Sequence, residues 1–267
     1  MTERVAILGT GNMGEAILAG ALGAGWSPGE IVATVRASER GAALRERFGV
    51  VTLTDNAAAV AGAALVVVAV KPKGVPALLG EIGRSLADGA VVVSVAAGVT
   101  TPAMESELPA GTPVVRTMPN TPAQIGAGIT AVAPGTAATD AHLALVERFL
   151  GGTGDVVRVA EKDMDAVTAL SGGGPAYVFL VIEAMTEAGV HAGLTRDVAA
   201  RLAQQTVLGA ARLTVESGEH PAILREKVTS PAGTTAAGLR ALEDAGVRAA
   251  FLAAIAAART RSEQLGA

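Results

Sequence analysis

The stretch VAILGTGNMGEAILAGA, residues 5–21, decides the fold predicted for this chain. A short apolar run of strand type leads directly into a glycine-rich turn, and a helical pattern follows. In this context the first glycine makes the tight turn, the second lets the backbone approach a pyrophosphate, and the third lets helix and strand pack closely. The helix N-terminus adds free N–H groups and a favourable dipole. We therefore predict dinucleotide binding, against the alternative of an ordinary glycine turn, by Gly9, Gly11, Asn12, Met13 and Gly14.

The end of the next predicted strand indicates which dinucleotide is bound. NAD-binding proteins usually carry an acidic residue about 20 residues after the glycines, where it binds the ribose 2′-hydroxyl. Here the segment is Thr34-Val35-Arg36-Ala37-Ser38, which has no acid. Arg36 can pair with a 2′-phosphate and Ser38 can add a hydrogen bond, which favours NADP. The alternative is that Arg36 is a solvated loop charge.

Further candidates follow other strands, because ligands of open α/β sheets bind outside the carboxyl ends of the strands. One strand ends at Val70-Lys71-Pro72, another at Ala96-Ala97-Gly98, and a third at Met118 and Asn120. Lys71 fits a cofactor contact and an ordinary helix-entry charge about equally, and the last segment also fits a simple strand-end turn. Arg116 fits either a structural ion pair or a site contact.

The chain as a whole divides into an α/β half, residues 1–160, and an all-helical half, residues 161–267. In the first half, Val- and Ile-rich runs alternate with Ala-rich helical stretches, as in a parallel sheet with crossover helices. Strands are expected at 4–8, 31–35, 65–70, 90–95, 113–118, 128–133 and 156–159, and helices at 13–24, 39–48 and 140–150. The second half has helical patterns at 175–192, 195–217, 236–244 and 247–265.

Composition excludes several classes of protein. The chain has 267 residues, a formal charge of -4 and only 17% charged residues, which argues against nucleic-acid binding and against disorder. With no cysteine it forms no disulfide, and its 3 histidines are too scattered in sequence to suggest a metal site. The apolar stretches are shorter than the roughly 18–20 residues that span a bilayer, and no secretory signal is visible, so we expect a cytoplasmic protein with no membrane partner.

Two loops of the second half are rich in glycine and hydroxyl groups. Ser171-Gly172-Gly173-Gly174-Pro175 is expected to break a helix and bend the chain. Ser171 lacks the preceding glycine of a hydrolase nucleophile elbow, so nucleophilic chemistry is disfavoured. The second loop, residues 228–235, precedes a helix and can offer backbone N–H groups to a small carboxylate, although residue propensity alone favours simple N-capping.

These motifs together resemble the pyrroline-5-carboxylate reductase family. The resemblance rests on GTGNMGEA at 9–16, AVKPK at 69–73, VAAGV at 95–99, VRTMPNTPAQIGAG at 115–128, DAVTALSGGGPAYVF at 165–179 and VTSPAGTT at 228–235. Their order and spacing cover nearly the whole chain. The sequence departs from the family pattern at Gly173, where a serine is usual, and at Ala232, where a glycine is usual.

The resemblance implies a fold, a reaction and an assembly. The fold is a Rossmann-like N-terminal domain followed by an all-helical C-terminal domain that interlocks with a partner in a homodimer, and dimers can assemble into decamers. The reaction is the NAD(P)H-dependent reduction of 1-pyrroline-5-carboxylate to L-proline, the last step of proline biosynthesis, with NADPH expected and NADH as an alternative. Carried onto this chain, Ser230, Gly233, Thr234 and Thr235 hold the substrate, and Asn56 contacts the cofactor.

We expect Thr235 to act as the catalytic residue by donating a hydrogen bond to the imine nitrogen while the neighbouring backbone groups hold the carboxylate. A hydroxyl is a poor free acid, so the proton comes from solvent or is already on the substrate. Two alternative functions remain open. One is a β-hydroxyacid dehydrogenase or another imine reductase, although Lys162 and Lys227 do not match the hydroxyacid motif. The other is a sensor that binds NADP(H) without turnover.

Overall fold

The computed structural model describes residues 3–266 and divides the chain into two units. One unit comprises the residues up to Gly173 together with those from Ala258 onward, and the other is Gly174–Ala257. The division falls after the change from α/β to helical patterning at residue 160, because the helical turns that follow Glu161 belong to the first unit. The last helix starts in the second unit and ends in the first.

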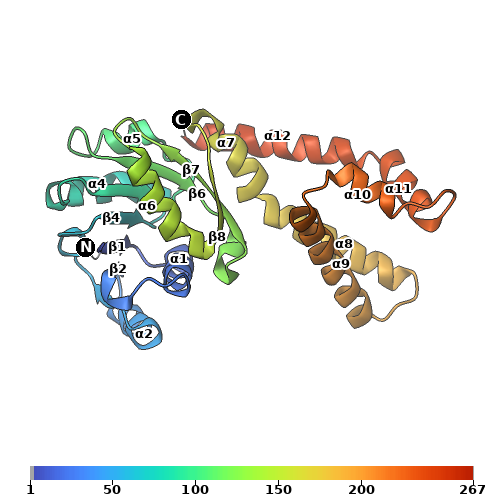
Figure 1. Cartoon of the computed structure of the whole chain (residues 1–267), viewed down its shortest axis with the longest axis horizontal. Helices are drawn as coiled ribbons and strands as arrows, with labels where there is room; N and C mark the ends of the chain where they lie inside the picture. The colour runs from blue at the N-terminus through green and yellow to red at the C-terminus, as the bar shows by residue number, and fades with distance from the viewer. Residues whose placement is uncertain (1–2, 267) are drawn as a thin grey trace. The chain divides into compact units, whose positions relative to one another are not determined.

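The first unit is built on one eight-stranded sheet with the order β3-β2-β1-β4-β5-β6-β7-β8 (Figure 1). The pairs are parallel except β6–β7, which is antiparallel. The first six strands have the order of a dinucleotide-binding fold. The strands are β1 Val5–Leu8, β2 Ile31–Thr34, β3 Val51–Leu53, β4 Leu65–Val68, β5 Val91–Ser94, β6 Val114–Met118, β7 Gly128–Pro134 and β8 Gly154–Arg158.

Helices cover both faces of this sheet, because its central strands are apolar on both sides. In β1, Val5 and Ile7 pack on one face with α1 (Asn12–Gly23), α2 (Ser38–Phe48) and α6 (Asp140–Leu150). Ala6 and Leu8 pack on the other face with α3 (Asn56–Val60), α4 (Val75–Ile82) and α5 (Thr101–Glu105). Such a doubly covered parallel sheet confirms the fold class predicted for this half.

Short helical turns connect these elements. The 3₁₀ turns are η1 Pro28–Glu30, η2 Pro72–Gly74, η3 Gly83–Ser85, η4 Thr121–Ile125, η5 Gly151–Thr153 and η6 Glu161–Asp163.

At the sheet edge, Arg158 of β8 donates hydrogen bonds to Glu147 of α6 and lowers the pKa of that carboxyl. Arg158 therefore ties the last strand to the helix that precedes it.

The helical half begins with α7 (Met164–Val167), passes through the π-helix η7 (Thr168–Gly172) and continues as α8 (Gly174–His191). The remaining helices are α9 Arg196–Ser217, α10 Pro221–Lys227, α11 Thr234–Asp244 and α12 Val247–Gly266. Helices α8 and α9 form a close hairpin, since a Cβ at Gly189 would lie 2.9 Å from the Cβ of Ala199. The predicted all-helical character is confirmed.

Many large apolar side chains of the second unit are exposed in the single chain. Phe179 and Leu180 of α8 are 62% and 65% exposed, and Leu202 and Leu213 of α9 are each 54% exposed. By length and composition alone, the helical stretch 161–191 would suffice to cross a membrane. That test is weak evidence, because an apolar helix that packs against another protein chain passes it too.

Two expectations about secondary structure were wrong. The edge strand β3 was not predicted as a strand, because it is only three residues long and Val51, at its start, is half exposed. The predicted break at Ser171–Pro175 is narrower than expected: Ser171 and Gly172 lie in the π-helix η7, Gly173 forms a single bend, and α8 starts at Gly174. A π-helix is a rare single-turn insertion that often marks a functional site.

Candidate active site

The glycine turn after β1 has the geometry that its sequence predicts. Gly9 has a φ of +81°, and a Cβ there would lie 2.4 Å from Cγ1 of Val70. A Cβ at Gly14 would meet the Cβ of Ala69 and the carbonyl oxygen of Gly9, each at 3.3 Å, so this glycine allows close packing of helix and strand. A Cβ at Gly11 would have nothing within 4 Å. The backbone at Gly11 is therefore open to a ligand.

The turn is fixed to the neighbouring strand and leaves the start of α1 uncapped. The Gly9 N–H donates to Oγ1 of Thr34 at 3.0 Å, and the Thr10 N–H donates to the Thr34 carbonyl at 2.9 Å. Within the described part of the chain no side chain caps α1, which begins with Asn12 and Met13. N–H groups of this first turn can therefore bind an anion.

The cations near this turn differ in whether an acid neutralises them. Arg40 and Arg47 of α2 both form ion pairs with Glu15 of α1. Arg36, which follows β2, is exposed and has no ion-pair partner within residues 3–266. Ser38 is the exposed first residue of α2. Arg36 is therefore available for an anion, whereas the two arginines of α2 are already paired.

The loops after β4 and β5 lie at the same edge of the sheet as the glycine turn after β1, because β1, β4 and β5 are consecutive parallel strands of the sheet. Lys71 is exposed, precedes Pro72 of η2, and has no ion-pair partner in the described part of the chain. After β5, Ala96 is buried, Ala97 is exposed and Gly98 has a φ of +78°. The left-handed φ makes glycine the favoured residue at position 98.

Asn56 begins α3, just after the edge strand β3. Its amide Nδ2 donates to Oε1 of Glu81 at 3.2 Å, and Asp55 caps the helix. A cofactor contact from the Asn56 side chain would compete with this carboxylate.

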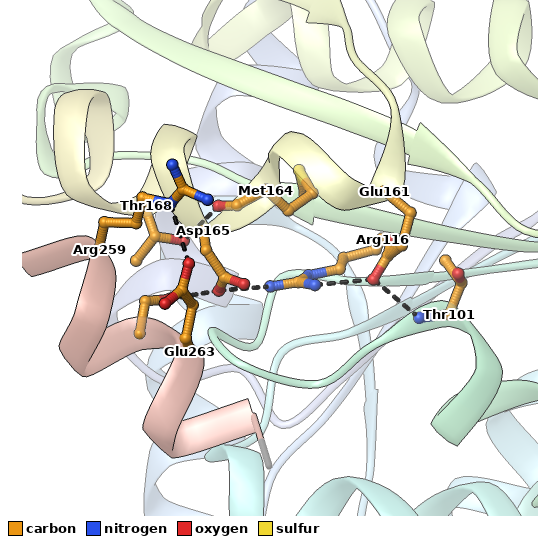
Figure 2. A network of polar contacts seen from close by, with 9 residues as sticks. Thr101, Arg116, Glu161, Met164, Asp165, Thr168, Arg259 and Glu263 are labelled. Carbon is orange, nitrogen blue, oxygen red and sulfur yellow. Dashed lines mark hydrogen bonds and ion pairs between the residues drawn. The ribbon is translucent and has the colours of Figure 1, made fainter.

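The strand β6 carries Arg116, whose role the sequence left open. Its side chain is only 4% exposed, and NH1 forms an ion pair with Oε1 of Glu161 at 2.7 Å. NH2 lies 3.9 Å from Oδ1 of Asp165 (Figure 2). Arg116 therefore makes the structural ion pair, which was one of its two alternatives.

The end of β6 contacts the π-helix. A Cβ at Gly172 would lie 2.5 Å from Cε of Met118, so the Met118 side chain packs directly on this glycine. The Asn120 amide Nδ2 donates to the Ser171 carbonyl at 3.2 Å, and Oδ1 accepts from the Ile129 N–H at 3.0 Å. The Asn120 side chain thus links three segments of the first unit, which sequence reasoning missed because the partners are far apart in the chain.

The hydroxyl-rich loop 228–235 lies in the second unit and leads into α11. Gly233 is the N-cap of α11, and no side chain caps the helix. A Cβ at Gly233 would lie 2.2 Å from Oγ of Ser230 and 3.1 Å from its carbonyl oxygen, so a side chain there would require Ser230 to move. Thr234 and Thr235 are exposed, and no hydrogen bond of the Thr235 hydroxyl is found within the described residues. The structure does not bear out the simple N-capping interpretation.

The predicted residues therefore fall into two groups. The cofactor candidates gather at the carboxyl ends of β1, β2, β4, β5 and β6, except Asn56, which follows the edge strand. The substrate candidates gather at the start of α11 in the other unit. Within residues 3–266, no group of three or more His, Asp or Glu side chains is arranged to hold a metal ion.

Comparison with known proteins identifies families for both halves of the chain. Residues 161–265 match the family model "Pyrroline-5-carboxylate reductase dimerisation", and residues 4–98 match "NADP oxidoreductase coenzyme F420-dependent". A pyrroline-5-carboxylate reductase of Corynebacterium melassecola is 46% identical over 265 residues, which covers 98% of both chains. One of Mycobacterium tuberculosis is 45% identical over 98% of this chain and 96% of its own.

Comparison with solved structures points to the same family. The pyrroline-5-carboxylate reductase of Coxiella burnetii has a TM-score of 0.97 at 37% identity and covers 100% of both chains. The Plasmodium falciparum enzyme, solved with NADP bound, has a TM-score of 0.87 at 27% identity, over 99% of this chain and 98% of its own. Similarity that extends over both units at this level confirms the resemblance inferred from the motifs, and the chain belongs to the pyrroline-5-carboxylate reductase family.

Proposed function

We propose that this protein reduces 1-pyrroline-5-carboxylate to L-proline, the final step of proline biosynthesis, with NADPH as the reductant. The observation that carries the proposal is the 46% identity to a pyrroline-5-carboxylate reductase over 98% of both chains. The family model and the NADP-bound relative support the choice of cofactor.

The residues at the carboxyl edge of the sheet fit an anionic dinucleotide. The open face of Gly11 and the uncapped start of α1 suit a pyrophosphate, and Arg36 suits a 2′-phosphate because no acid neutralises it within residues 3–266. When bound, NADPH supplies the hydride that the imine carbon of the substrate accepts. The residues proposed to hold it are Gly9, Gly11, Asn12, Met13, Gly14, Arg36, Ser38, Asn56, Val70, Lys71, Pro72, Ala96, Ala97, Gly98, Met118 and Asn120.

The loop before α11 is proposed to hold the substrate. Backbone N–H groups around Ser230, Gly233 and Thr234 bind the carboxylate, since the uncapped helix start favours an anion. The Thr235 hydroxyl donates a hydrogen bond to the ring nitrogen, which orients the ring and stabilises the electron pair that moves onto nitrogen as the neighbouring carbon accepts the hydride. The proton comes from solvent or arrives on the substrate, because a threonine hydroxyl is too weak an acid to supply it.

The second unit is proposed to pair with the same unit of another copy. The match to a dimerisation family model and the exposed apolar side chains of α8 and α9 support a homodimer with interlocked helices. Such pairing accounts for the apolar stretch 161–191 without a membrane. Assembly of dimers into decamers, and a cytoplasmic location, complete the proposal.

The test is the initial rate of NADPH oxidation by the purified protein, with and without 1-pyrroline-5-carboxylate, combined with chromatographic detection of proline. A substrate-dependent rate that yields proline supports the reaction. NADPH binding without turnover favours a sensor, and reduction of NADP⁺ by a 3-hydroxy acid, measured as the reverse reaction, instead favours a hydroxyacid dehydrogenase. A parallel series with NADH tests the phosphate role of Arg36, because a preference for NADH removes that role and leaves the reaction in place.

A further inference from the structure

The last turn of α12 packs against the α/β unit. Ser262 is only 5% exposed, and its hydroxyl donates to Oδ1 of Asp165 at 2.6 Å, across 97 residues of sequence. Asp165 lies in α7, and α12 starts outside this unit, at Val247. The hydrogen bond therefore attaches the C-terminal end of the chain to the unit that carries the cofactor candidates.

The attachment point belongs to a charge network around the buried Arg116, and this network reaches the loop after β5. The Arg116 guanidinium lies between Glu161 and Asp165, and Oε1 of Glu161 also accepts from the Thr101 N–H at 3.3 Å (Figure 2). Thr101 is the first residue of α5, directly after the loop that contains Gly98. The second carboxylate oxygen of Glu161, Oε2, is buried and has no hydrogen-bond partner among the residues that the structure describes. The residue Thr101, which follows the loop, is therefore hydrogen-bonded to the same network that accepts the hydrogen bond of Ser262.

The end of α12 also contacts the loop directly. A Cβ at Gly98 would lie 3.6 Å from the carbonyl oxygen of Leu265, and a Cβ at Gly266 would lie 3.1 Å from the carbonyl oxygen of Gly98. Two independent observations therefore converge: the last turn of α12 packs on the backbone of Gly98, and Ser262 fixes that turn to the network behind the loop.

We propose that Ser262 is a positioning residue, which uses the last turn of α12 to hold the loop Ala96–Gly98 in the conformation that binds NADPH. The inference rests on the proposed function, because it takes this loop to be part of the cofactor site. A loop ordered in advance loses less conformational freedom when the cofactor binds, and so binds it more tightly. Ser262 itself need not touch the cofactor.

The test compares full-length Ser262→Ala with wild type and with the matched control Ser106→Ala. Ser106 is also a serine at a helix end, but its hydroxyl donates only to the local Ala103 carbonyl. The dissociation constant for NADPH is measured by fluorescence titration without substrate, and hydrogen–deuterium exchange is followed in residues 95–101. Saturation kinetics give kcat and the KM for 1-pyrroline-5-carboxylate.

We expect Ser262→Ala to bind NADPH about five- to tenfold more weakly, because a hydrogen bond to a charged group is of the size that changes an equilibrium constant tenfold. Exchange in residues 95–101 should rise, while kcat at saturating NADPH and the KM for the imine stay near wild type, as they do in Ser106→Ala. A merely structural role would instead lower the active fraction and the unfolding temperature without a selective change in NADPH binding.

Unchanged NADPH affinity and unchanged exchange in residues 95–101 would overturn the inference. If Ser262→Ala does not fold, Ser262→Cys retains the shape with a weaker donor and is expected to show the same selective loss at smaller amplitude. Failure of the wild type to bind NADPH at all would count against the proposed function, whereas the exchange comparison would still decide whether Ser262 orders the loop.

Discussion

The loop before α11 contains a backbone conformation that predicts an unusual response to mutation. Ala232 has a φ of 56°, and among the described residues it is the only non-glycine residue with a positive φ. It is also the position where the family usually has glycine. We expect Ala232→Gly to stabilise the protein, although replacing alanine by glycine normally destabilises it.

The magnitude follows from two opposing terms. The left-handed conformation costs an L-residue roughly 1–2 kcal/mol. Glycine loses about 0.5–1 kcal/mol more backbone entropy on folding than alanine does. Because Ala232 is exposed and its side chain lies outside any core cluster, the difference should remain as roughly 0.5–1 kcal/mol of stabilisation. For a chain of this size that corresponds to about 1–4 °C in the unfolding temperature.

The assay is urea unfolding followed by circular dichroism at one fixed protein concentration, because dimerisation makes stability depend on concentration. The matched control is Ala241→Gly, an exposed alanine in α11, which should lose about 1 kcal/mol. The two alanine-to-glycine changes therefore have opposite predicted signs. A lower midpoint for Ala232→Gly, similar to that of the control, would refute the argument that position 232 is strained.

The remaining predictions concern the proposed site. Thr235→Ala should lower kcat about a hundredfold, because it removes one hydrogen-bond donor aimed at the reacting group. The NADPH dissociation constant should stay near wild type. Equal losses in kcat and in NADPH affinity would contradict the role assigned to Thr235. Arg36→Ala should lower kcat/KM for NADPH by about tenfold to a hundredfold and leave the value for NADH unchanged, with the exposed Arg84→Ala as a control measured in the same two series. Asn120→Ala removes both links to Ser171 and Ile129 and should destabilise the first unit by roughly 1–3 kcal/mol in urea unfolding, and an unchanged midpoint would mean that these links contribute nothing in solution.

Local sequence signals predicted most of the α/β half. The glycine turn, the Val-rich strands and the helices are recognisable because each is defined by residues close together in the chain. The prediction failed where the local signal was weak or ambiguous. β3 is a three-residue edge strand that begins with an exposed valine, and the glycines at 172–174 predicted a longer break than the single bend at Gly173.

In the proposed site, too, short-range sequence patterns indicated some residues and could not indicate the roles of others. The residues proposed to bind through backbone groups, such as Gly9, Gly11 and Gly233, were chosen from the sequence because each is a glycine at a predicted turn or helix start. The roles of Arg116 and Asn120 could not, since each depends on partners tens of residues away. A buried arginine has no sequence signature that separates an ion pair from a ligand contact.

The sequence by itself determined the family, the order of the two halves and the positions of the backbone-lined loops, because these depend on short-range patterns and on motif spacing. Only the tertiary structure decided that Arg40 and Arg47 are paired with Glu15 while Arg36 has no such partner in the described residues. It also decided that Ser262 reaches Asp165, and that the end of α12 lies on Gly98. The physical reason is that ion pairs and hydrogen bonds act over a few ångströms, and only the folded chain brings groups 97 residues apart to that distance.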